Sequence, residues 1–139
     1  MTGIGKWCLG VVALAILIAT GCAGAYSMED RLDLRVDQFN DTVRWGRYFT
    51  AANFVHADIR EEWLADHRGW DRDVRIAEYE VIDSTPDLEA SNTYVVRVVI
   101  SWYRMSEGMV QTTMLAQRWR REERTWQLVS EEVEEGTPL

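Results

Sequence analysis

The feature that most constrains the fold is a change in hydrophobic spacing near Asp73. From Met28 to about Trp70, the apolar side chains recur every three or four residues, which is the spacing of one face of a helix. From Asp73 to Val133, β-branched and aromatic residues alternate with polar ones, which is typical of half-buried strands. A single change from helical to strand spacing predicts an α+β fold, in which amphipathic N-terminal helices pack on an antiparallel sheet.

The helical part divides into two predicted helices. The first spans 28–55, and Gly46, where the phase of the apolar stripe shifts, marks either a bend or a close contact between helices. The second is shorter, spans 56–70 and ends near Gly69. The side chains expected to face the sheet are Leu32, Val36, Phe39, Val43, Ile59, Trp63 and Leu64.

Four strands are predicted after the helices. The first covers 73–83, where the apolar residues change phase half-way, so that a bulge near Ala77 or Glu78 is needed to keep them on one face. The strands that follow are joined by the short turns "SEG" and "REER", which predicts a four-stranded antiparallel meander. The acidic end, 130–139, is expected to fray into solvent. The later strands are expected at 93–105, 109–120 and 125–133, with Tyr94, Val96, Val98, Ile100 and Trp102 on one face.

This order of elements resembles a known superfamily. Together with the segments "WGRYFTAANFV" and "QRW…TWQLV", it is similar to small bacterial lipoproteins of the nuclear-transport-factor-2-like (SnoaL-like) superfamily over about 30–133. The resemblance implies a cone-shaped, cystatin-like architecture, with a curved sheet and a pocket between sheet and helices. Some members are enzymes, such as ketosteroid isomerase and scytalone dehydratase, and others only bind partners or small molecules, so the fold alone assigns no function.

The N-terminus has the pattern of a secretory signal. Lys6 is followed by an apolar core and by small residues before Cys22. The ending "ATGC" resembles the lipobox of bacterial lipoproteins, although Ala19 stands where that family prefers leucine. In that family the cysteine receives a diacylglyceryl group, the signal is cut before it, and the new terminus is acylated, for example with palmitate.

The resemblance divides the chain into three parts. It implies a signal peptide over 1–21, a lipidated cysteine and short tether over 22–27, and a single α+β domain over 28–139. The alternative is an uncleaved anchor helix from about residue 7 to 25, although its apolar run is short for a bilayer span of about 20 residues. Ala23, in place of the aspartate that retains some lipoproteins at the inner membrane, favours the periplasmic face of the outer membrane.

Charge and cysteine content restrict the function further. After removal of Lys6 with the signal, 14 basic residues remain against 23 acidic ones, a net charge of −9. This charge argues against binding to nucleic acid, which requires basic patches, and against lying flat on an anionic lipid surface. Because Cys8 also leaves with the signal, the domain has no disulfide, and packing alone must hold it together.

No residue pattern predicts catalysis or a metal site. His56 and His67 are expected near the two ends of the second helix, about 16 Å apart at 1.5 Å per residue, which is too far to share one ion. The aspartates of the first helix, such as Asp37 and Asp41, alternate with arginines and are expected in solvent. Glu78 and Glu80 are the nearest candidates for an inward carboxylate on a strand. We therefore expect no catalytic residue, no cofactor and no metal.

The balance favours a binding module over an enzyme. The expected partners are the membrane, through acyl chains on Cys22, and an envelope protein or a small apolar ligand, with a homodimer through the sheet face as a further option. The alternative is a pocket enzyme of isomerase, dehydratase or hydrolase type acting on a small lipophilic substrate, which an inward desolvated carboxylate or histidine would favour. The candidate pocket or interface residues, which also fit a plain core, are Trp45, Tyr48, Trp102 and Tyr103.

Overall fold

The structure, a computed structural model, describes residues 28–139. The predicted signal peptide over 1–21, Cys22 and the tether lie outside these residues. None of the helices described is both long and apolar enough to span a bilayer. The elements are α1 (Met28–Arg44), α2 (Tyr48–Ala51), the 3-10 helix η1 (Ala52–Phe54), α3 (Ala57–Asp66), α4 (Trp70–Asp73), β1 (Val74–Pro86), β2 (Thr93–Arg104), β3 (Val110–Glu122) and β4 (Thr125–Gly136).

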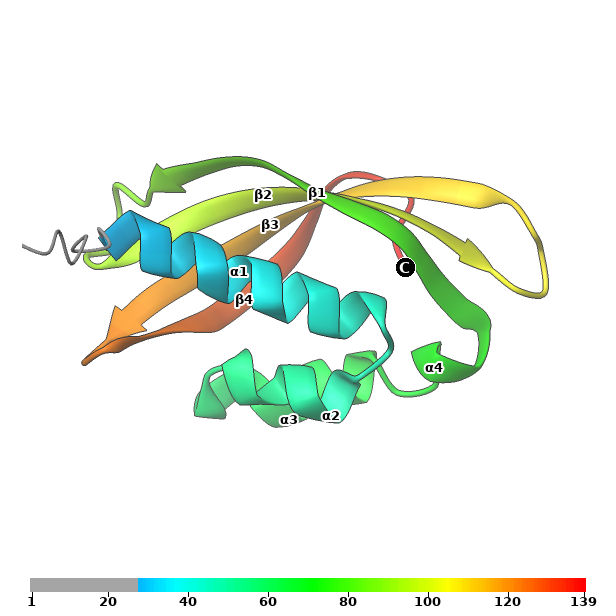
Figure 1. Cartoon of the computed structure of the whole chain (residues 1–139), viewed down its shortest axis with the longest axis horizontal. Helices are drawn as coiled ribbons and strands as arrows, with labels where there is room; N and C mark the ends of the chain where they lie inside the picture. Colours follow the sequence, from blue (N-terminus) through cyan, green and yellow to red (C-terminus); the bar gives the residue numbers. More distant parts are fainter. Residues whose placement is uncertain (1–27) are drawn as a thin grey trace, which may run out of the picture.

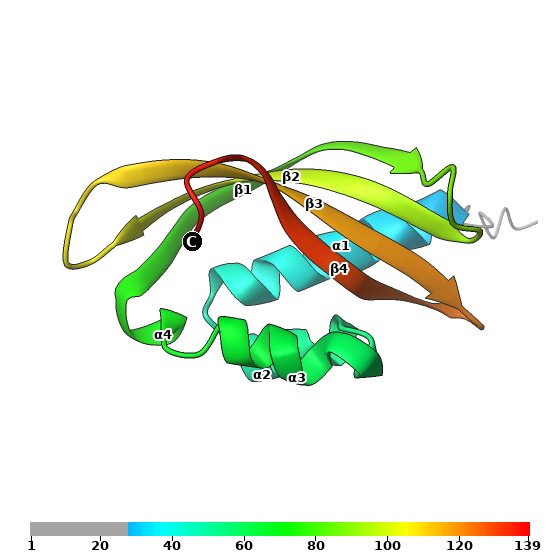
Figure 2. The same ribbon diagram turned by 180° about the vertical axis from the view of Figure 1, so that it is seen from behind.

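The predicted α+β class and antiparallel sheet are confirmed. The four strands lie in the order β1-β2-β3-β4, and each pairs antiparallel with the next. Figures 1 and 2 show the helices gathered on one face of this twisted sheet, with the other face uncovered.

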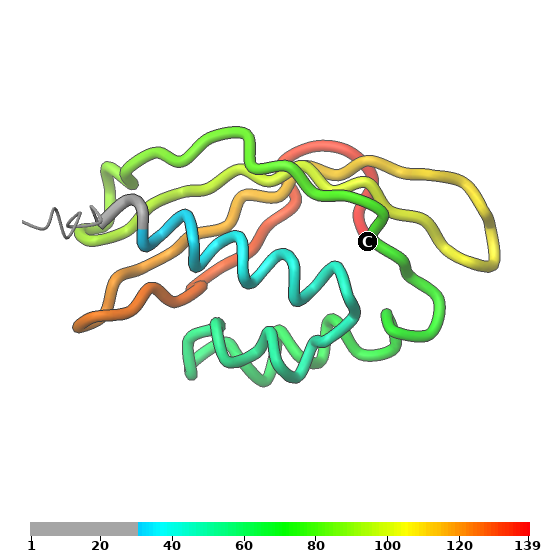
Figure 3. Tube along the Cα trace, viewed as in Figure 1, coloured from blue at the N-terminus to red at the C-terminus, as the bar shows by residue number. Residues whose placement is uncertain are grey.

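The helical region differs from its prediction at Gly46. The expected single helix over 28–55 instead ends at Arg44, and the chain turns back into α2 and η1 (Figure 3). Gly46 has φ +68°, and its N–H donates to the carbonyl of Val43 at 2.9 Å. Because a left-handed residue cannot continue a right-handed helix, this glycine reverses the chain rather than bending it.

The predicted bulge in β1 is confirmed, and a second one follows it. The pairing of β1 with β2 shifts between Ile76 and Glu78 and again between Val81 and Asp83. Each shift inserts one unpaired residue and changes which side chains face the helices. Glu78 and Glu80 are both exposed, so neither supplies the inward carboxylate considered above.

The prediction that the acidic end frays is wrong. β4 continues through Glu131, Glu132 and Val133 to Gly136, which pairs with Thr113 of β3. Strand pairing uses backbone N–H and C=O groups and requires no apolar side chains. Because the carboxylates of this segment point largely into solvent, its sequence lacks the apolar alternation from which a strand is predicted.

The core lies between α1 and the inner face of the sheet. The predicted stripe of α1 is confirmed as buried, and it packs with the alternate residues of β2. Phe39 meets Trp119 of β3 edge to face, with ring centroids 5.4 Å apart, and Trp63 of α3 at 5.7 Å. This aromatic cluster joins both helical layers to the sheet.

We predict that Gly136→Ala destabilises the C-terminal end by about 3 kcal/mol, because left-handed strain and a steric clash add. Gly136 has φ +91°, and a Cβ atom there would lie 2.3 Å from the carbonyl oxygen of Thr112. The matched control is Gly108→Ala, where φ is +69° but no atom lies within 4 Å. Urea unfolding should give about 1 kcal/mol for the control, and equal losses in the two variants would contradict the prediction.

Candidate functional site

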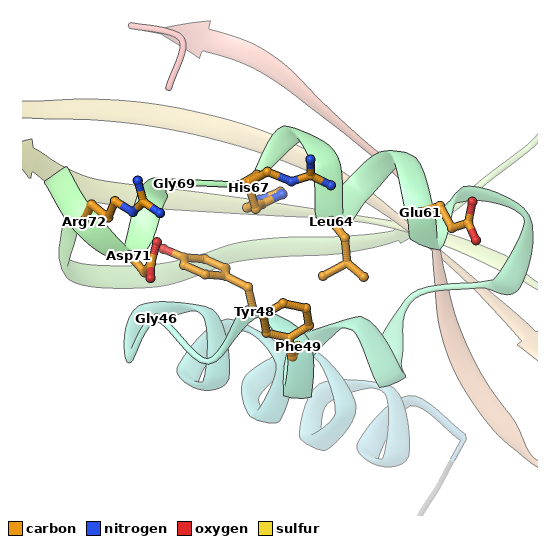
Figure 4. A pocket seen from close by; sticks show the side chains of 10 residues that line it. Gly46, Tyr48, Phe49, Glu61, Leu64, His67, Gly69, Asp71 and Arg72 are labelled. Carbon is orange, nitrogen blue, oxygen red and sulfur yellow. The ribbon is translucent and has the colours of Figure 1, made fainter.

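Two hollows adjoin at one end of the domain. The first, about 550 Å³, lies between α2, α3 and α4, and the second, about 440 Å³, lies between the end of α1, α4, β1 and β2. Gly46, Tyr48 and Asp71 line both of them. Figure 4 shows the first hollow, in which Phe49 of α2 and Leu64 of α3 face one another.

Three of the four predicted aromatic residues meet at the second hollow. Trp45, Tyr48 and Tyr103 line it, whereas Trp102 does not. Trp102 is 2% exposed, and its Nε1 donates to the hydroxyl of Thr113 at 2.9 Å. Trp102 is therefore a core residue, because the alternation of β2 turns it toward the helices.

Tyr48 separates the two hollows. It is buried, its ring lies edge to face with Trp70 at 6.1 Å, and its centroid is 5.6 Å from that of His67. Burial raises the pKa of the Tyr48 hydroxyl, and the nearby Asp71 carboxylate raises it further. The hydroxyl therefore stays protonated at neutral pH and keeps a donor at the point where the two hollows meet.

Exposed aromatic side chains border both hollows. Phe49 is 86% exposed and Trp45 is 64% exposed. The indole of Trp45 is held in place, because its Nε1 donates to Asp41 at 3.1 Å and the guanidinium of Arg44 lies 5.6 Å from its ring centre. Exposed apolar groups that are gathered beside hollows, rather than scattered singly, are typical of binding sites.

Arginines surround these aromatics without carboxylate partners. Among the described residues, none of the four arginines that line the two hollows forms a salt bridge, and Arg75 donates instead to the carbonyls of Asp71 and Val74. Beside them, Arg104 does pair with Asp73, at 3.5 Å. The arginines that do form salt bridges with carboxylates lie on β2 and β3. We call this surface the Tyr48 face, made of Trp45, Tyr48, Phe49, Tyr103, Arg44, Arg68, Arg72 and Arg75.

Sequence reasoning missed the part of this face that comes from α2, α3 and α4. In a helix continuing over 28–55, Phe49 would lie on the shifted apolar stripe after Gly46, but the reversal at Gly46 turns it outward. The local signs of this change in the sequence are Gly46 itself, which permits the positive φ found there, and the shift in phase of the apolar stripe at that residue. Arg68 and Arg72 flank Gly69, and only the packing of α4 beside α2 brings them to Tyr48.

A second polar cluster lies beneath the first hollow, around His67. This buried histidine stacks on Trp63 with centroids 3.9 Å apart, and its Nδ1 donates to the carbonyl of Trp63 at 2.7 Å. Its Nε2 lies 3.8 Å from Oε1 of Glu131. His67 thus lies at the end of α3, as predicted, and its side chain is buried.

Glu131 is an inward carboxylate that sequence reasoning missed. Its Oε2 accepts a hydrogen bond from Gln117 at 2.8 Å, and its Oε1 accepts one from the indole of Trp63 at 3.4 Å. Trp126 and Leu128 of β4 are buried, so strict alternation along the strand would turn residue 130 inward as well. The pairing of β3 with β4 shifts at this point, and the bulge turns Glu131 inward instead.

The remaining candidates lie in solvent or serve the fold. His56 caps α3, where its Nδ1 accepts the N–H of Asp58 at 3.2 Å, as its predicted place at the helix start implies. Asp37 accepts a hydrogen bond from Tyr79, whose pKa is raised by burial and then by this carboxylate. Within residues 28–139, no three His, Cys, Asp or Glu side chains are grouped closely enough to hold a metal ion.

No family model, curated protein or solved structure matches this chain significantly. The candidate site consists of an exposed aromatic and arginine-rich face with two hollows, and of the buried His67 at the first hollow with the partly buried carboxylate of Glu131 behind it.

Proposed function

We propose that this chain is a lipid-anchored cell-envelope protein that acts as a non-catalytic binding module through the Tyr48 face. The observation that carries the proposal is the pair of exposed aromatics, Trp45 and Phe49, beside two hollows ringed by arginines without carboxylate partners among the described residues. Aromatic residues and arginine are enriched in protein interfaces and supply most of their binding energy. The hollows also fall in the size range of sites for small ligands.

We also propose that the domain is of the cone-shaped, nuclear-transport-factor-2-like type. The helices on one face of a twisted sheet and the hollows at the end of that sandwich support this assignment. In that superfamily the open sheet face serves some members as a dimer contact. Here that face carries ion pairs from Arg97 to Asp83 and Glu134, which favours the Tyr48 face as the main contact.

The anchor proposed at Cys22 determines where this module works. Five residues separate Cys22 from Met28, so the start of α1 lies within about 20 Å of the acylated cysteine, given about 3.5 Å per extended residue. Two or three acyl chains would hold the protein firmly to a bilayer. The proposed location is the periplasmic face of the outer membrane.

Co-purification tests the proposed function. The full-length protein is extracted in mild detergent beside a Cys22→Ala form and a Trp45→Ala/Phe49→Ala form. We expect a specific protein partner with the first two forms and its loss with the third. The matched control is Leu34→Ala/Leu88→Ala, which removes two exposed apolar side chains elsewhere and should retain the partner. Equal recovery with both double variants would contradict a role for the Tyr48 face.

A pocket enzyme is the second candidate, and His67 with Glu131 favours it. These are the buried histidine and inward carboxylate that such an enzyme would use. Both oxygens of Glu131 and Nδ1 of His67 are engaged in internal hydrogen bonds, which favours a structural role. Incubation with an envelope lipid extract distinguishes the enzyme from the binding module. If the protein is an enzyme, the wild type converts a lipophilic compound of the extract and the His67→Gln variant does not.

A further inference from the structure

We propose that the Tyr48 face binds an acidic segment of a protein partner, and that this segment inserts one large apolar side chain into the first hollow. This inference rests on the proposed binding function and names the chemistry of the partner. It is carried by the charge of the face, by the walls of the hollow and by the position of both relative to the start of α1.

The charge of the face is opposite to that of the rest of the domain. Four arginines line the two hollows, and only Glu61 and Asp71 among the carboxylates do so, a net charge of +2. The rest of residues 28–139 carries ten arginines against 21 carboxylates, a net charge of −11. An acidic partner is therefore attracted to this end and repelled elsewhere, which selects both the partner and its orientation.

The first hollow offers an apolar site beside this charge. Its walls include Tyr48, Phe49 and Leu64, and Arg68 and Arg72 also line it. Figure 4 shows the guanidinium of Arg72 at one end of the hollow and the facing Phe49 and Leu64 along it. A side chain buried between Phe49 and Leu64 would place neighbouring carboxylates of the same segment within reach of the arginines, whose planar groups bind carboxylates in a bidentate manner.

The location of the face favours a protein over a lipid surface. α1 has 17 residues and is therefore about 25 Å long, with the Tyr48 face at its C-terminal end. Figures 1 and 2 show α4, which contributes to the face, at the end of the domain opposite to the start of α1. An anchor attached before Met28 holds the start of α1 toward the bilayer, so the face points away from it.

Selection from a random peptide library tests the inference without a known partner. Phage displaying random dodecamers are panned on the full-length protein in neutral detergent. We expect enriched peptides with clustered Asp and Glu around one aromatic or leucine residue, with affinity that weakens as salt rises. The variant Arg68→Glu/Arg72→Glu should weaken their binding at least ten-fold, whereas Arg31→Glu/Arg124→Glu, with two exposed arginines elsewhere, should leave it unchanged.

Three outcomes would overturn the inference. The first is enrichment of neutral or basic peptides alone, or no enrichment. The second is equal binding of acidic peptides to the two charge-reversal variants. The third is flotation of the Cys22→Ala form with phosphatidylglycerol vesicles and its loss in Arg68→Glu/Arg72→Glu, which would assign the face to anionic lipid.

Failure of the inference can be separated from failure of the proposed function. If the enriched peptides were neutral and lost affinity on Phe49→Ala, the proposal that this face binds a partner would stand. Only the inference that the partner is acidic would be contradicted. Loss of the binding function itself is reported by the co-purification experiment with Trp45→Ala/Phe49→Ala, which makes no assumption about charge.

Discussion

Trp119→Ala is expected to lower the free energy of unfolding by about 3–5 kcal/mol, the usual range for removing a buried aromatic side chain. Trp119 is 0% exposed and lies edge to face with Phe39 at 5.4 Å. Its indole also donates to Oε1 of Gln117 at 3.3 Å, so truncation removes packing and one hydrogen bond together. The chain has no disulfide within residues 28–139 that could offset this loss.

The matched control for this prediction is Trp45→Ala. The same side chain is removed, but Trp45 is 64% exposed and contributes little to the core. Its loss should change the free energy of unfolding by about 0.5 kcal/mol or less, as is usual at the surface. Urea unfolding followed by far-ultraviolet circular dichroism measures both variants without relying on tryptophan fluorescence. Similar losses at the two positions would show that the core is not centred on Trp119.

Gln117→Met is expected to lower the free energy of unfolding by about 3–5 kcal/mol, although the volume of the side chain is nearly retained. Gln117 is fully buried, and its Nε2 donates to Asn40 at 2.9 Å and to Glu131 at 2.8 Å. Its Oε1 accepts hydrogen bonds from Asn40 and Trp119. Replacement by methionine would leave Asn40, Trp119 and Glu131 each without at least one hydrogen bond inside the protein. The energetic cost is largest for the carboxylate of Glu131, because it is charged.

Gln38→Met provides the control for this second prediction. Gln38 lies on the exposed side of α1, so the same change of side chain should be close to neutral there. A double variant, Gln117→Met/Asn40→Leu, removes both members of the buried amide pair. Its loss should be smaller than the sum of the two single losses, because the unpaired Asn40 has been removed. A loss below about 1 kcal/mol for Gln117→Met alone would mean that water replaces its hydrogen bonds.

Local pattern was sufficient for the features that depend on neighbouring residues. The alternation of β2 gave its inner face correctly, and the conflict of phase in β1 gave the bulge after Ile76. Local pattern was not sufficient where contacts with segments distant in sequence determine the structure. The bulge that turns Glu131 inward arises from pairing with β3, and no feature of the sequence around 126–131 reveals it.

The candidate site was predicted only in part for the same reason. Trp45, Tyr48 and Tyr103 could be named as large aromatics, but their meeting depends on the reversal at Gly46 and on the packing of α4 against β1. The contribution of Arg68 and Arg72 depends on the same tertiary packing. A helical stripe that continues beyond a glycine is ambiguous in sequence, because the residues after it face inward in one geometry and outward in the other.

The two bulges of β1 have a consequence for how copies of the protein behave when crowded together. β1 is one edge of the sheet, and an edge strand with a regular row of free N–H and C=O groups invites pairing with another molecule. Each bulge interrupts that row, and the exposed carboxylates of Glu78 and Glu80 repel a second acidic strand. At the other edge, β4 is partly covered where Leu128 bridges Val55. The sheets of neighbouring copies at high density are therefore hindered from joining edge to edge into an aggregate.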